Sequence, residues 1–257
     1  MVAPLALQLY TLRDSIGSDP APMFERLAAA GYSAVESAGL YGLTPAEFAS
    51  RLDASGLALC SAHVGLDTRR ESWRDEFAAS LDEHRAAGAT IAVIPALMPD
   101  QFADAGAVGR AVDIVNSAST IATARDMVLG YHNHFWEFAD VAGRPALLAF
   151  FEGCDPAVIA EVDIYWATVG GADAAEVVRG LGARCGLLHV KDGPADDPAS
   201  DMVAVGSGVI PIEAILAAND DVAWHIVELD RCATDMVEAV EASADYLLGH
   251  GWSRGRA

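Results

Sequence analysis

Short apolar segments alternate with longer amphipathic segments along the whole chain. Most of the apolar segments have four to six residues, and continuous apolar runs of that length are typical of strands buried on both faces of a sheet. We expect eight strands, over residues 5–9, 34–36, 58–63, 91–95, 128–132, 158–163, 186–190 and 223–228.

The amphipathic segments between these strands carry helix start and stop signals. Thr44 is a capping residue before Pro45 at the first helical position, with Glu47 two residues further on, and this helix ends near Gly56. Further helices are expected over residues 22–30, 71–87, 172–181 and 234–248. Glycines that we place between a helix and the next strand are Gly31, Gly56, Gly88, Gly130 and Gly182.

The repeating unit is therefore a strand, a loop, a helix and the next strand, and eight units share 257 residues. Alternating strands and helices form parallel sheet. A closed (β/α)8 TIM barrel needs about 250 residues, so we expect one barrel domain over residues 1–257. A doubly wound open sheet is the alternative, but it usually has fewer strands and would need a second domain. The most polar loop, residues 193–201, follows the seventh strand, where a barrel carries active-site loops.

The net charge and the composition limit the classes of partner that we expect for this protein. The chain has 37 acidic and 16 basic residues and a net charge of −21. That charge repels phosphate backbones and acidic membranes, so we expect a small-molecule partner rather than nucleic acid. No apolar run approaches a membrane span or forms a signal peptide. Four widely spaced cysteines are typical of a reducing cytoplasm; a homo-oligomer is left open.

Polar side chains gather at the predicted carboxyl ends of the strands, which is where a barrel carries its chemistry. They include Gln8, Glu36, His63, His132, His134, Glu161, Asp163, His189, Lys191, Glu228 and Asp230. An unpaired buried charge costs several kcal/mol, so carboxylates and imidazoles from separate strands are best satisfied around a divalent cation. Oxygen and nitrogen ligands without thiolate suit Mn²⁺, Mg²⁺, Co²⁺ or Zn²⁺.

Structural explanations exist for single residues. One histidine on a strand is more often a core residue bonded to a carbonyl oxygen. Glu36 could pair with Arg13, and Lys191 with the adjacent Asp192. Glu161 and Asp163 lie two apart, share a face of the strand and could both pair with Lys191.

The joint pattern favours the cation site. Asp163, His189 and Glu228 each end a different consecutive strand. Chance placement of all three is much less probable than any single case.

At these residues the sequence resembles the xylose-isomerase-like TIM-barrel superfamily, the sugar phosphate isomerase/epimerase group. The similar segments are LQLYTLRD (7–14), GYSAVESAGLYG (31–42), SAHVGLD (61–67), GYHNHFWEF (130–138), EVDIYWATVGG (161–171), HVKD (189–192), VGSGVIPI (205–212) and VELD (227–230). The YHNHxxEF and HVKD segments are specific together and weak alone.

The resemblance implies one divalent cation with ligands from strands five to eight. Three of them carry over as Asp163, His189 and Glu228. In the fifth strand the usual glutamate position holds His132, and a carboxylate returns five residues later as Glu137. We favour Glu137 as the fourth ligand because it preserves the charge of the site, with His132 and Glu161 as alternatives.

Such a site suits proton abstraction next to a carbonyl, through an enediolate. The resemblance implies an isomerase or epimerase of a sugar or keto-sugar, with Glu228 or Glu137 as base and His134 as acid. Substrate-binding candidates are Gln8, His63, His132, Trp166 and Lys191, with Trp136 as a second stacking side chain.

Other functions fit the same residues. A lyase or dehydratase of the inosose, 3-dehydroshikimate or 3-keto-glycoside type is the first alternative, and a non-catalytic sugar- or metal-binding barrel is the second. An apurinic endonuclease needs a basic surface that this chain lacks. The Gly206-Ser207-Gly208 segment resembles a phosphate-binding loop, but without an adjacent arginine we expect an unphosphorylated substrate.

Overall fold

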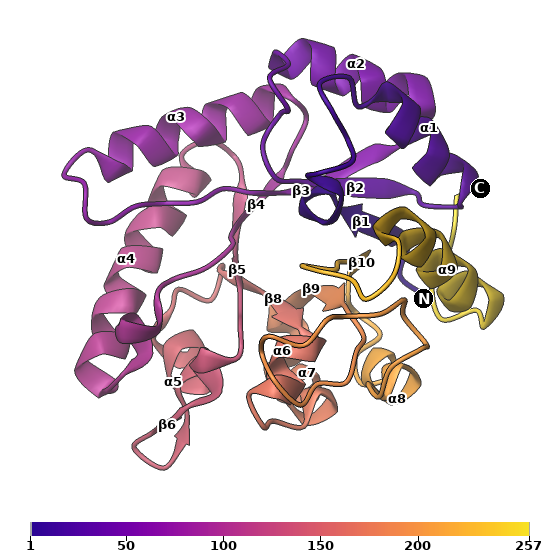
Figure 1. Ribbon diagram of the computed structural model, residues 1–257. Helices are drawn as coiled ribbons and strands as arrows, with labels where there is room; N and C mark the ends of the chain where they lie inside the picture. Colours follow the sequence, from indigo (N-terminus) through magenta and orange to yellow (C-terminus); the bar gives the residue numbers. More distant parts are fainter. Residues whose placement is uncertain (1, 257) are drawn as a thin grey trace.

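Eight parallel strands close into a barrel in the computed structural model, which describes residues 2–256 (Figure 1). The barrel strands are β1 (Leu5–Gln8), β2 (Ala34–Ser37), β3 (Ala58–His63), β4 (Ile91–Ile94), β5 (Val128–His132), β8 (Ile159–Asp163), β9 (Cys185–Val190) and β10 (Trp224–Val227). They follow one another in chain order around the barrel, and β10 pairs with β1. The predicted (β/α)8 TIM barrel is confirmed.

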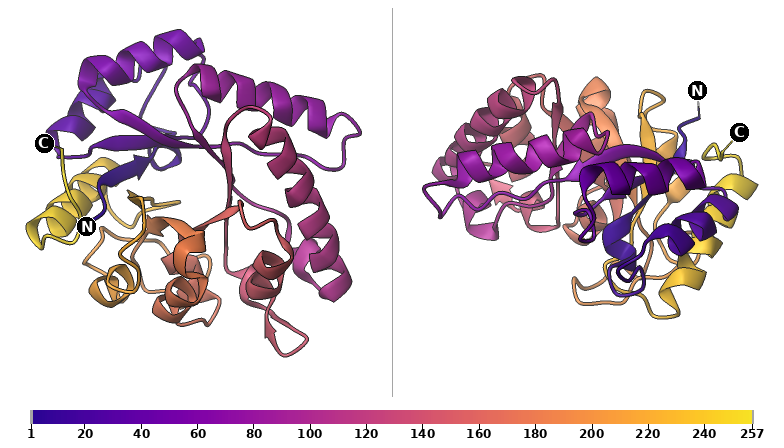
Figure 2. Two further views of the ribbon diagram at one scale, coloured as in Figure 1. Left: turned by 180° about the vertical axis from the view of Figure 1, so that it is seen from behind. Right: turned by 90° about the horizontal axis from the view of Figure 1, so that it is seen from above.

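The longer helices surround the barrel, as both views of Figure 2 show. The helices are α1 (Ala21–Ala29), α2 (Pro45–Ser55), α3 (Trp73–Ala86), α4 (Ala105–Thr123), α5 (Ala146–Gly153), α6 (Ile164–Val169), α7 (Ala174–Leu181), α8 (Ile212–Leu216) and α9 (Met236–Gly249). The two ends of the chain are joined by backbone hydrogen bonds, from Leu5 N to Arg254 O and from Arg254 N to Ala3 O, each 2.9 Å long. None of the helices within residues 2–256 is both long and apolar enough to cross a bilayer.

The predicted start of α2 is present in the structure. The Thr44 side chain accepts a hydrogen bond from the backbone N–H of Glu47, and the Glu47 carboxylate accepts one from the backbone N–H of Thr44. Gly56 ends the helix with a φ of 65°, in the left-handed region that favours glycine. Both ends of this helix follow from the local sequence alone.

The inside of the barrel has an apolar floor, and the polar residues stand above it. The floor consists of Ala6, Ala34, Cys60, Val93, Leu187 and Ile226, which form one buried cluster. Successive side chains of a strand point to opposite faces, so a residue two positions further on stands one step nearer the carboxyl end. Gln8, Glu36, His189 and Glu228 occupy such positions above floor residues. The strand period therefore places these polar side chains inside the barrel.

Two features differ from the sequence-based expectation. Gly130 lies within β5 rather than before it. A Cβ atom there would lie 3.1 Å from Val93 Cγ2, so glycine provides room inside the barrel. The helix expected from residue 234 begins at Met236, because the Asp235 carboxylate accepts the backbone N–H groups of Val237 and Glu238.

Several elements between the strands are not evident from the sequence pattern. They are α4, α5, α6, α8 and the small antiparallel pair β6 (Asp140–Val141) and β7 (Arg144–Pro145). Helix α4 is rich in alanine, glycine and serine, which weaken the contrast between its apolar and polar faces. The other missed helices have five to eight residues, too few for a clear period.

Candidate active site

Four side chains with metal-ligand chemistry meet at the carboxyl ends of β5, β8, β9 and β10. They are His132, Asp163, His189 and Glu228, and one nitrogen or oxygen atom from each lies within 4.8 Å of those of the others. All four side chains are buried. We call these four residues the rim group. The three residues that the resemblance implies as ligands thus lie together, and the fourth member of the group comes from the fifth strand as His132.

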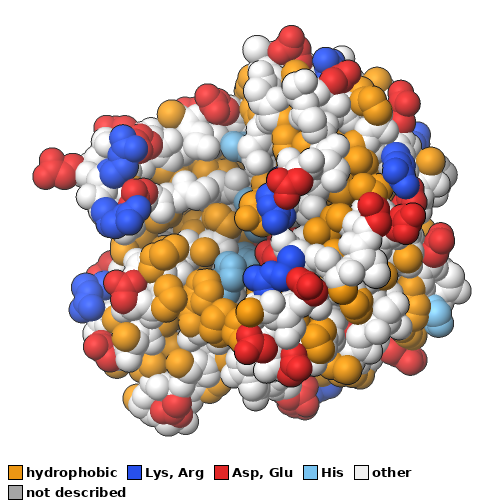
Figure 3. Space-filling view, in the orientation of Figure 1, with side chains coloured by type: hydrophobic (Ala, Val, Ile, Leu, Met, Phe, Trp, Pro, Cys, Tyr) orange, Lys and Arg blue, Asp and Glu red, His pale blue; other side chains and the backbone are white. Residues whose placement is uncertain are grey.

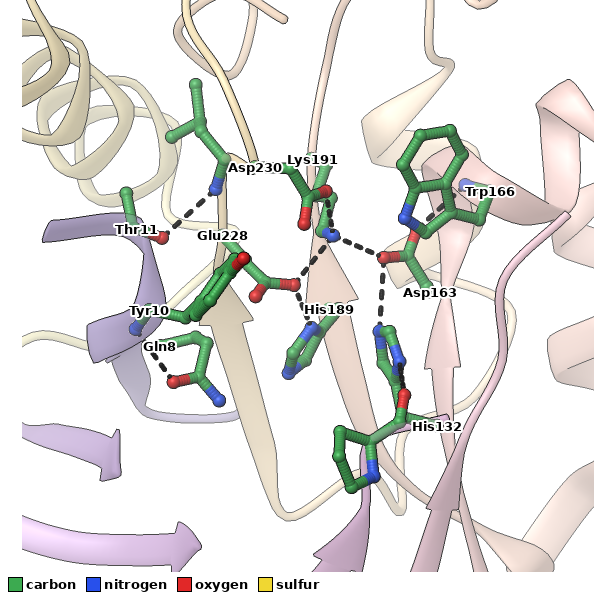
Figure 4. Close-up of polar contacts among 12 residues, drawn as sticks. Gln8, Tyr10, Thr11, His132, Asp163, Trp166, His189, Lys191, Glu228 and Asp230 are labelled. Carbon is green, nitrogen blue, oxygen red and sulfur yellow. Dashed lines mark hydrogen bonds and ion pairs between the residues drawn. The ribbon is translucent and has the colours of Figure 1, made fainter. Parts of the chain in front are cut away.

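Hydrogen bonds orient the ligand atoms of the rim group (Figure 4). His132 Nδ1 lies 3.0 Å from Pro95 O, and His132 Nε2 lies 3.3 Å from Asp163 Oδ2. A carbonyl oxygen only accepts, so Nδ1 donates to Pro95, and this contact fixes the ring with Nε2 toward the group. Asp163 Oδ1 accepts the backbone N–H of Trp166 at 2.8 Å and so caps α6. These contacts leave His132 Nε2 and Asp163 Oδ2 facing the centre of the site.

Lys191 places an ammonium group beside the rim group. Its Nζ lies 2.9 Å from Asp163 Oδ2, 2.6 Å from Glu228 Oε2 and 2.7 Å from Asp230 Oδ2. Burial opposes the charge, but the three carboxylates outweigh it and raise the pKa of Lys191 well above its ordinary value. The ion pair with Asp192 considered from the sequence is not formed, because Lys191 turns to the rim group while the Asp192 carboxylate accepts backbone N–H groups of the loop after β9.

A second group lies one step deeper in the barrel. It consists of Glu36, His63, Glu161 and the Nε2 atom of His189, and we call it the lower group. His63 Nε2 lies 2.7 Å from Glu161 Oε2, and His189 Nε2 lies 3.1 Å from the same oxygen. Glu161 Oε1 is buried without a hydrogen-bond partner among the described residues. Glu161 and Asp163 share a face of β8, as expected, but Lys191 pairs with Asp163 and not with Glu161.

Glu36 is held inside the barrel rather than by Arg13. Its carboxylate accepts hydrogen bonds from Gln8 Nε2 at 2.6 Å, Ser61 Oγ at 2.6 Å and His189 Nε2 at 2.8 Å. Burial and the nearby Glu161 raise the pKa of Glu36, and the charges of the two histidines oppose that shift.

Arg13 instead donates to the backbone oxygens of Tyr10 and Asp230 at the surface. The pairing of Arg13 with Glu36 considered from the sequence is therefore wrong, since one side chain lies at the rim and the other inside.

Glu137 belongs to neither group. Its Oε1 accepts the Tyr131 hydroxyl at 2.7 Å, and its Oε2 accepts the backbone N–H of His134 at 3.0 Å. Burial raises the pKa of Glu137 to about 7. These contacts hold the turn after β5, and both carboxylate oxygens already have donors.

A cavity of about 340 Å³ opens onto the rim group. It is lined by Tyr10, Ala38, His63, Pro95, Ala96, His132, His134, Glu228 and Asp230. Figure 3 shows histidine side chains at the bottom of a hollow near the centre of this face. The cavity has the size of a small-ligand site, with acidic and imidazole groups at its base.

One wall beside the cavity is aromatic. The His134 ring stacks on Trp136 with centroids 4.4 Å apart, and it lies 6.1 Å from the Trp166 ring. Burial lowers the pKa of His134 to about 2, so the ring is neutral. His134 Nδ1 and Trp166 Nε1 have no hydrogen-bond partner within the described part of the chain. Both atoms are buried; His134 lines the cavity, whereas Trp166 is not among the lining residues.

The Gly206–Gly208 segment surrounds a carboxylate of the chain itself. Asp192 Oδ2 accepts the backbone N–H groups of Gly206 and Gly208, at 2.9 and 3.0 Å, and Asp192 Oδ1 accepts that of Ile210 at 3.1 Å. A phosphate bound at this segment would need the same backbone N–H groups, which already donate to Asp192. The segment thus shapes the loop after β9 instead of forming a phosphate site.

Two signals in the sequence could have revealed more of the site. Asp230 lies two positions after Glu228, so both side chains face inward. Lys191 is the only lysine, and the other 15 basic residues are arginines. A compact ammonium among three carboxylates suits lysine better than the planar guanidinium of arginine.

The barrel and its group of carboxylates and imidazoles define a class of (β/α)8 proteins that can hold a cation at the carboxyl ends of their strands. The sequence profile of the xylose isomerase-like TIM barrel family matches residues 24–247. The chain belongs to this family, which fits a sugar-modifying enzyme. A search of proteins with curated functions found no match.

Similar solved structures cover nearly the whole chain. A sugar phosphate isomerase/epimerase from Parabacteroides distasonis is 25% identical, with a TM-score of 0.84 over 99% of this chain and 96% of that one. D-allulose 3-epimerase from Methylomonas sp. is 15% identical, with a TM-score of 0.72 over 96% and 97%. A probable 3-DHS dehydratase from Bacillus anthracis is 14% identical, with a TM-score of 0.74 over 95% and 98%. The last two likenesses concern the fold alone.

Proposed function

We propose that this protein is a divalent-cation-dependent isomerase or epimerase that acts on an unphosphorylated sugar or keto-sugar. The observation that carries the proposal is the rim group, in which four ligand atoms from four strands lie within 4.8 Å of one another beside the cavity. Membership of the xylose isomerase-like family supports a sugar substrate.

The residues of the rim group fit a divalent cation. Two carboxylates and two imidazoles without thiolate suit Mn²⁺, Mg²⁺, Co²⁺ or Zn²⁺. His132, Asp163, His189 and Glu228 would hold it. His132 takes the fourth position in place of Glu137, whose oxygens already accept hydrogen bonds from Tyr131 and His134. The bound cation would supply Lewis-acid stabilisation of the negative charge that develops on a sugar carbonyl oxygen.

Glu228 is the base in this proposal. It lines the cavity, and its Oε2 is held by His189 Nδ1 and Lys191 Nζ, at 2.8 and 2.6 Å. These partners keep the pKa of Glu228 well below its ordinary range despite its burial. The carboxylate would take the proton from the carbon next to the carbonyl, whose oxygen receives the electron pair. Return of the proton to the other face or to the neighbouring carbon gives the epimer or isomer.

His134 binds the substrate in this proposal and does not act as an acid. A pKa of about 2 keeps the ring neutral at neutral pH, so it is not an imidazolium that could release a proton. The ring lines the cavity and can exchange a hydrogen bond with a sugar hydroxyl, and the adjacent Trp136 adds an apolar face. His63 lines the same cavity and provides a second imidazole toward a bound sugar.

The substrate is unphosphorylated in this proposal because the cavity offers a phosphate no basic side chain. The described lining residues include neither lysine nor arginine. Lys191 is wholly buried and paired with three carboxylates. The backbone donors of Gly206 and Gly208 already bind Asp192.

Hydrogen exchange tests this function before the natural substrate is known. The protein with Mn²⁺ is incubated in D₂O with D-allulose, and ¹H NMR follows loss of the proton next to the carbonyl. Exchange should stop after EDTA treatment and fall at least about 100-fold in Glu228→Gln, within the range of general base catalysis. The exposed Glu213→Gln is the matched control and should keep full exchange. Full exchange in Glu228→Gln, or none in the Mn²⁺-loaded wild type, would refute the proposal; loss of water after exchange would indicate a lyase.

A further inference from the structure

His189 uses both ring nitrogens, and they face different groups. Nδ1 lies 2.8 Å from Glu228 Oε2 in the rim group, whereas Nε2 lies 2.8 Å from Glu36 Oε1 in the lower group. Each nitrogen faces a carboxylate oxygen that only accepts, so both nitrogens donate a hydrogen bond in the cation-free protein. A cation binds a nitrogen lone pair and must therefore displace one of these two protons. The proton that is displaced decides on which side of His189 a cation is held.

The carboxylate of Glu36 is fixed in place by donors from three strands. Gln8 on β1, Ser61 on β3 and His189 on β9 all donate to it, over 2.6 to 2.8 Å. Glu36 and His189 are both wholly buried. An ionised carboxylate only accepts, so the nitrogen that faces it must carry the proton. These contacts keep the proton on Nε2, so the proton on Nδ1 is the one that a cation in the rim group displaces.

We propose that Glu36 is a positioning residue that holds His189 as the Nε2–H tautomer, so that Nδ1 presents its lone pair to the rim group. This inference rests on the proposed function, because the tautomer of His189 matters only if the rim group binds a cation. His189 would then bridge the Glu36 carboxylate and the cation, an arrangement that orients a histidine ligand and raises its basicity. Glu36 touches neither the cavity nor the reacting atoms.

A cation could instead bind in the lower group. The experiment must distinguish a cation there from a cation in the rim group. The four ligand atoms of the lower group alternate between nitrogen and oxygen, with neighbouring atoms 2.7 to 3.2 Å apart. A cation in the lower group would bind His189 through Nε2 and leave the proton on Nδ1. Glu36 would then be a ligand and not a positioning residue.

The role of Glu36 can be tested without any substrate by measuring the affinity of the protein for Mn²⁺. Mn²⁺ binding to the wild type, Glu36→Gln and Ser61→Ala is measured by EPR titration, with the thermal midpoint of each cation-free protein. Glu36→Gln should weaken Mn²⁺ binding about 10- to 100-fold, the usual effect of losing such a partner. Ser61→Ala is the matched control, because it removes a donor to the same carboxylate but leaves the His189 contact; its affinity should stay within about threefold.

A crystal of the wild type soaked in Mn²⁺ gives a test that does not depend on a variant. The anomalous peak should lie at His189 Nδ1, and a peak at Nε2 among Glu36, His63 and Glu161 overturns the inference. Equal Mn²⁺ affinity in Glu36→Gln and the wild type also overturns it, while the proposed function stands. Absence of Mn²⁺ binding by the wild type overturns both.

Discussion

Lys191 Nζ lies 2.6 Å from Glu228 Oε2, on one of the oxygen atoms that the proposed cation would use. The same ammonium contacts Asp163 Oδ2 at 2.9 Å, so it and a divalent cation compete for two carboxylates. Asp230 Oδ2, at 2.7 Å, remains as a partner for Lys191 when the other two are taken. The single lysine of the chain therefore balances the charge of the site and would limit the affinity of the site for the proposed cation.

Replacing Lys191 by methionine should strengthen cation binding and weaken the cation-free fold. The change removes the competing charge and leaves the buried carboxylates of Asp163 and Glu228, and the partly exposed one of Asp230, without their ammonium partner. We expect Mn²⁺ to bind about tenfold more tightly, which corresponds to about 1.4 kcal/mol. The thermal midpoint should fall without Mn²⁺ and recover when it is added. Calorimetric titration and thermal melts measure both effects; weaker Mn²⁺ binding in Lys191→Met would show that the lysine supports the site.

Asp163→Asn should abolish cation binding and keep the start of α6. The amide oxygen can still accept the backbone N–H of Trp166, whereas the atom that replaces Oδ2 loses its charge. Loss of a ligand should cost more than the 10- to 100-fold known for outer partners, so we expect at least about 100-fold weaker Mn²⁺ binding.

The matched control is Asp173→Asn, which changes the capping residue of α7 outside the site. It should leave Mn²⁺ affinity unchanged. If Asp163→Asn instead lowers the thermal midpoint while Mn²⁺ binding persists, the role of Asp163 is structural.

Gly208→Ala should loosen the loop that follows β9. A Cβ atom at residue 208 would overlap Asp192 Oδ1 and Gly193 N, so the backbone must move away from the carboxylate. We expect a loss of about 1–3 kcal/mol of stability and faster proteolysis within residues 193–210. Gly180→Ala is the control, because a Cβ there meets no atom within 4 Å. Equal cleavage of the two variants would show that Asp192 does not hold the loop.

His225 lies at the end of the barrel opposite the site. It should make the stability of the folded protein fall in mild acid. Burial lowers its pKa from 6.5 to about 4, and its Nδ1 lies 3.0 Å from Ser253 Oγ. The unfolded chain therefore takes up this proton first, and stability falls as the pH drops from 6.5 toward 4 and levels off below that value. The full contribution is about 3 kcal/mol.

Urea unfolding of the wild type and His225→Gln at pH 7, 5.5 and 4.5 measures this contribution. The wild type should lose more stability than the variant across that range, since the variant lacks the titrating ring. Parallel losses in both proteins would assign the acid sensitivity to other groups.

Local sequence determined the strands and the face on which each polar residue lies. Residues two apart on a strand share a face, so Asp163, His189 and Glu228 were expected inside the barrel near one rim. Local signals also determined both ends of α2, where Thr44 and Glu47 cap each other and Gly56 adopts a positive φ. These features depend on neighbours within a few residues, and a sequence displays such neighbours directly.

Only the tertiary structure decided which of these side chains are partners. Closure of the barrel brings Glu36 within 2.8 Å of His189, 153 positions away, and it brings Lys191 to Glu228 rather than to the adjacent Asp192. The turn after β5 directs Glu137 to Tyr131 and leaves His132 beside Asp163. A strand period specifies the face on which a side chain lies, but the stagger between strands sets its height in the barrel, and that stagger exists only once the barrel has closed.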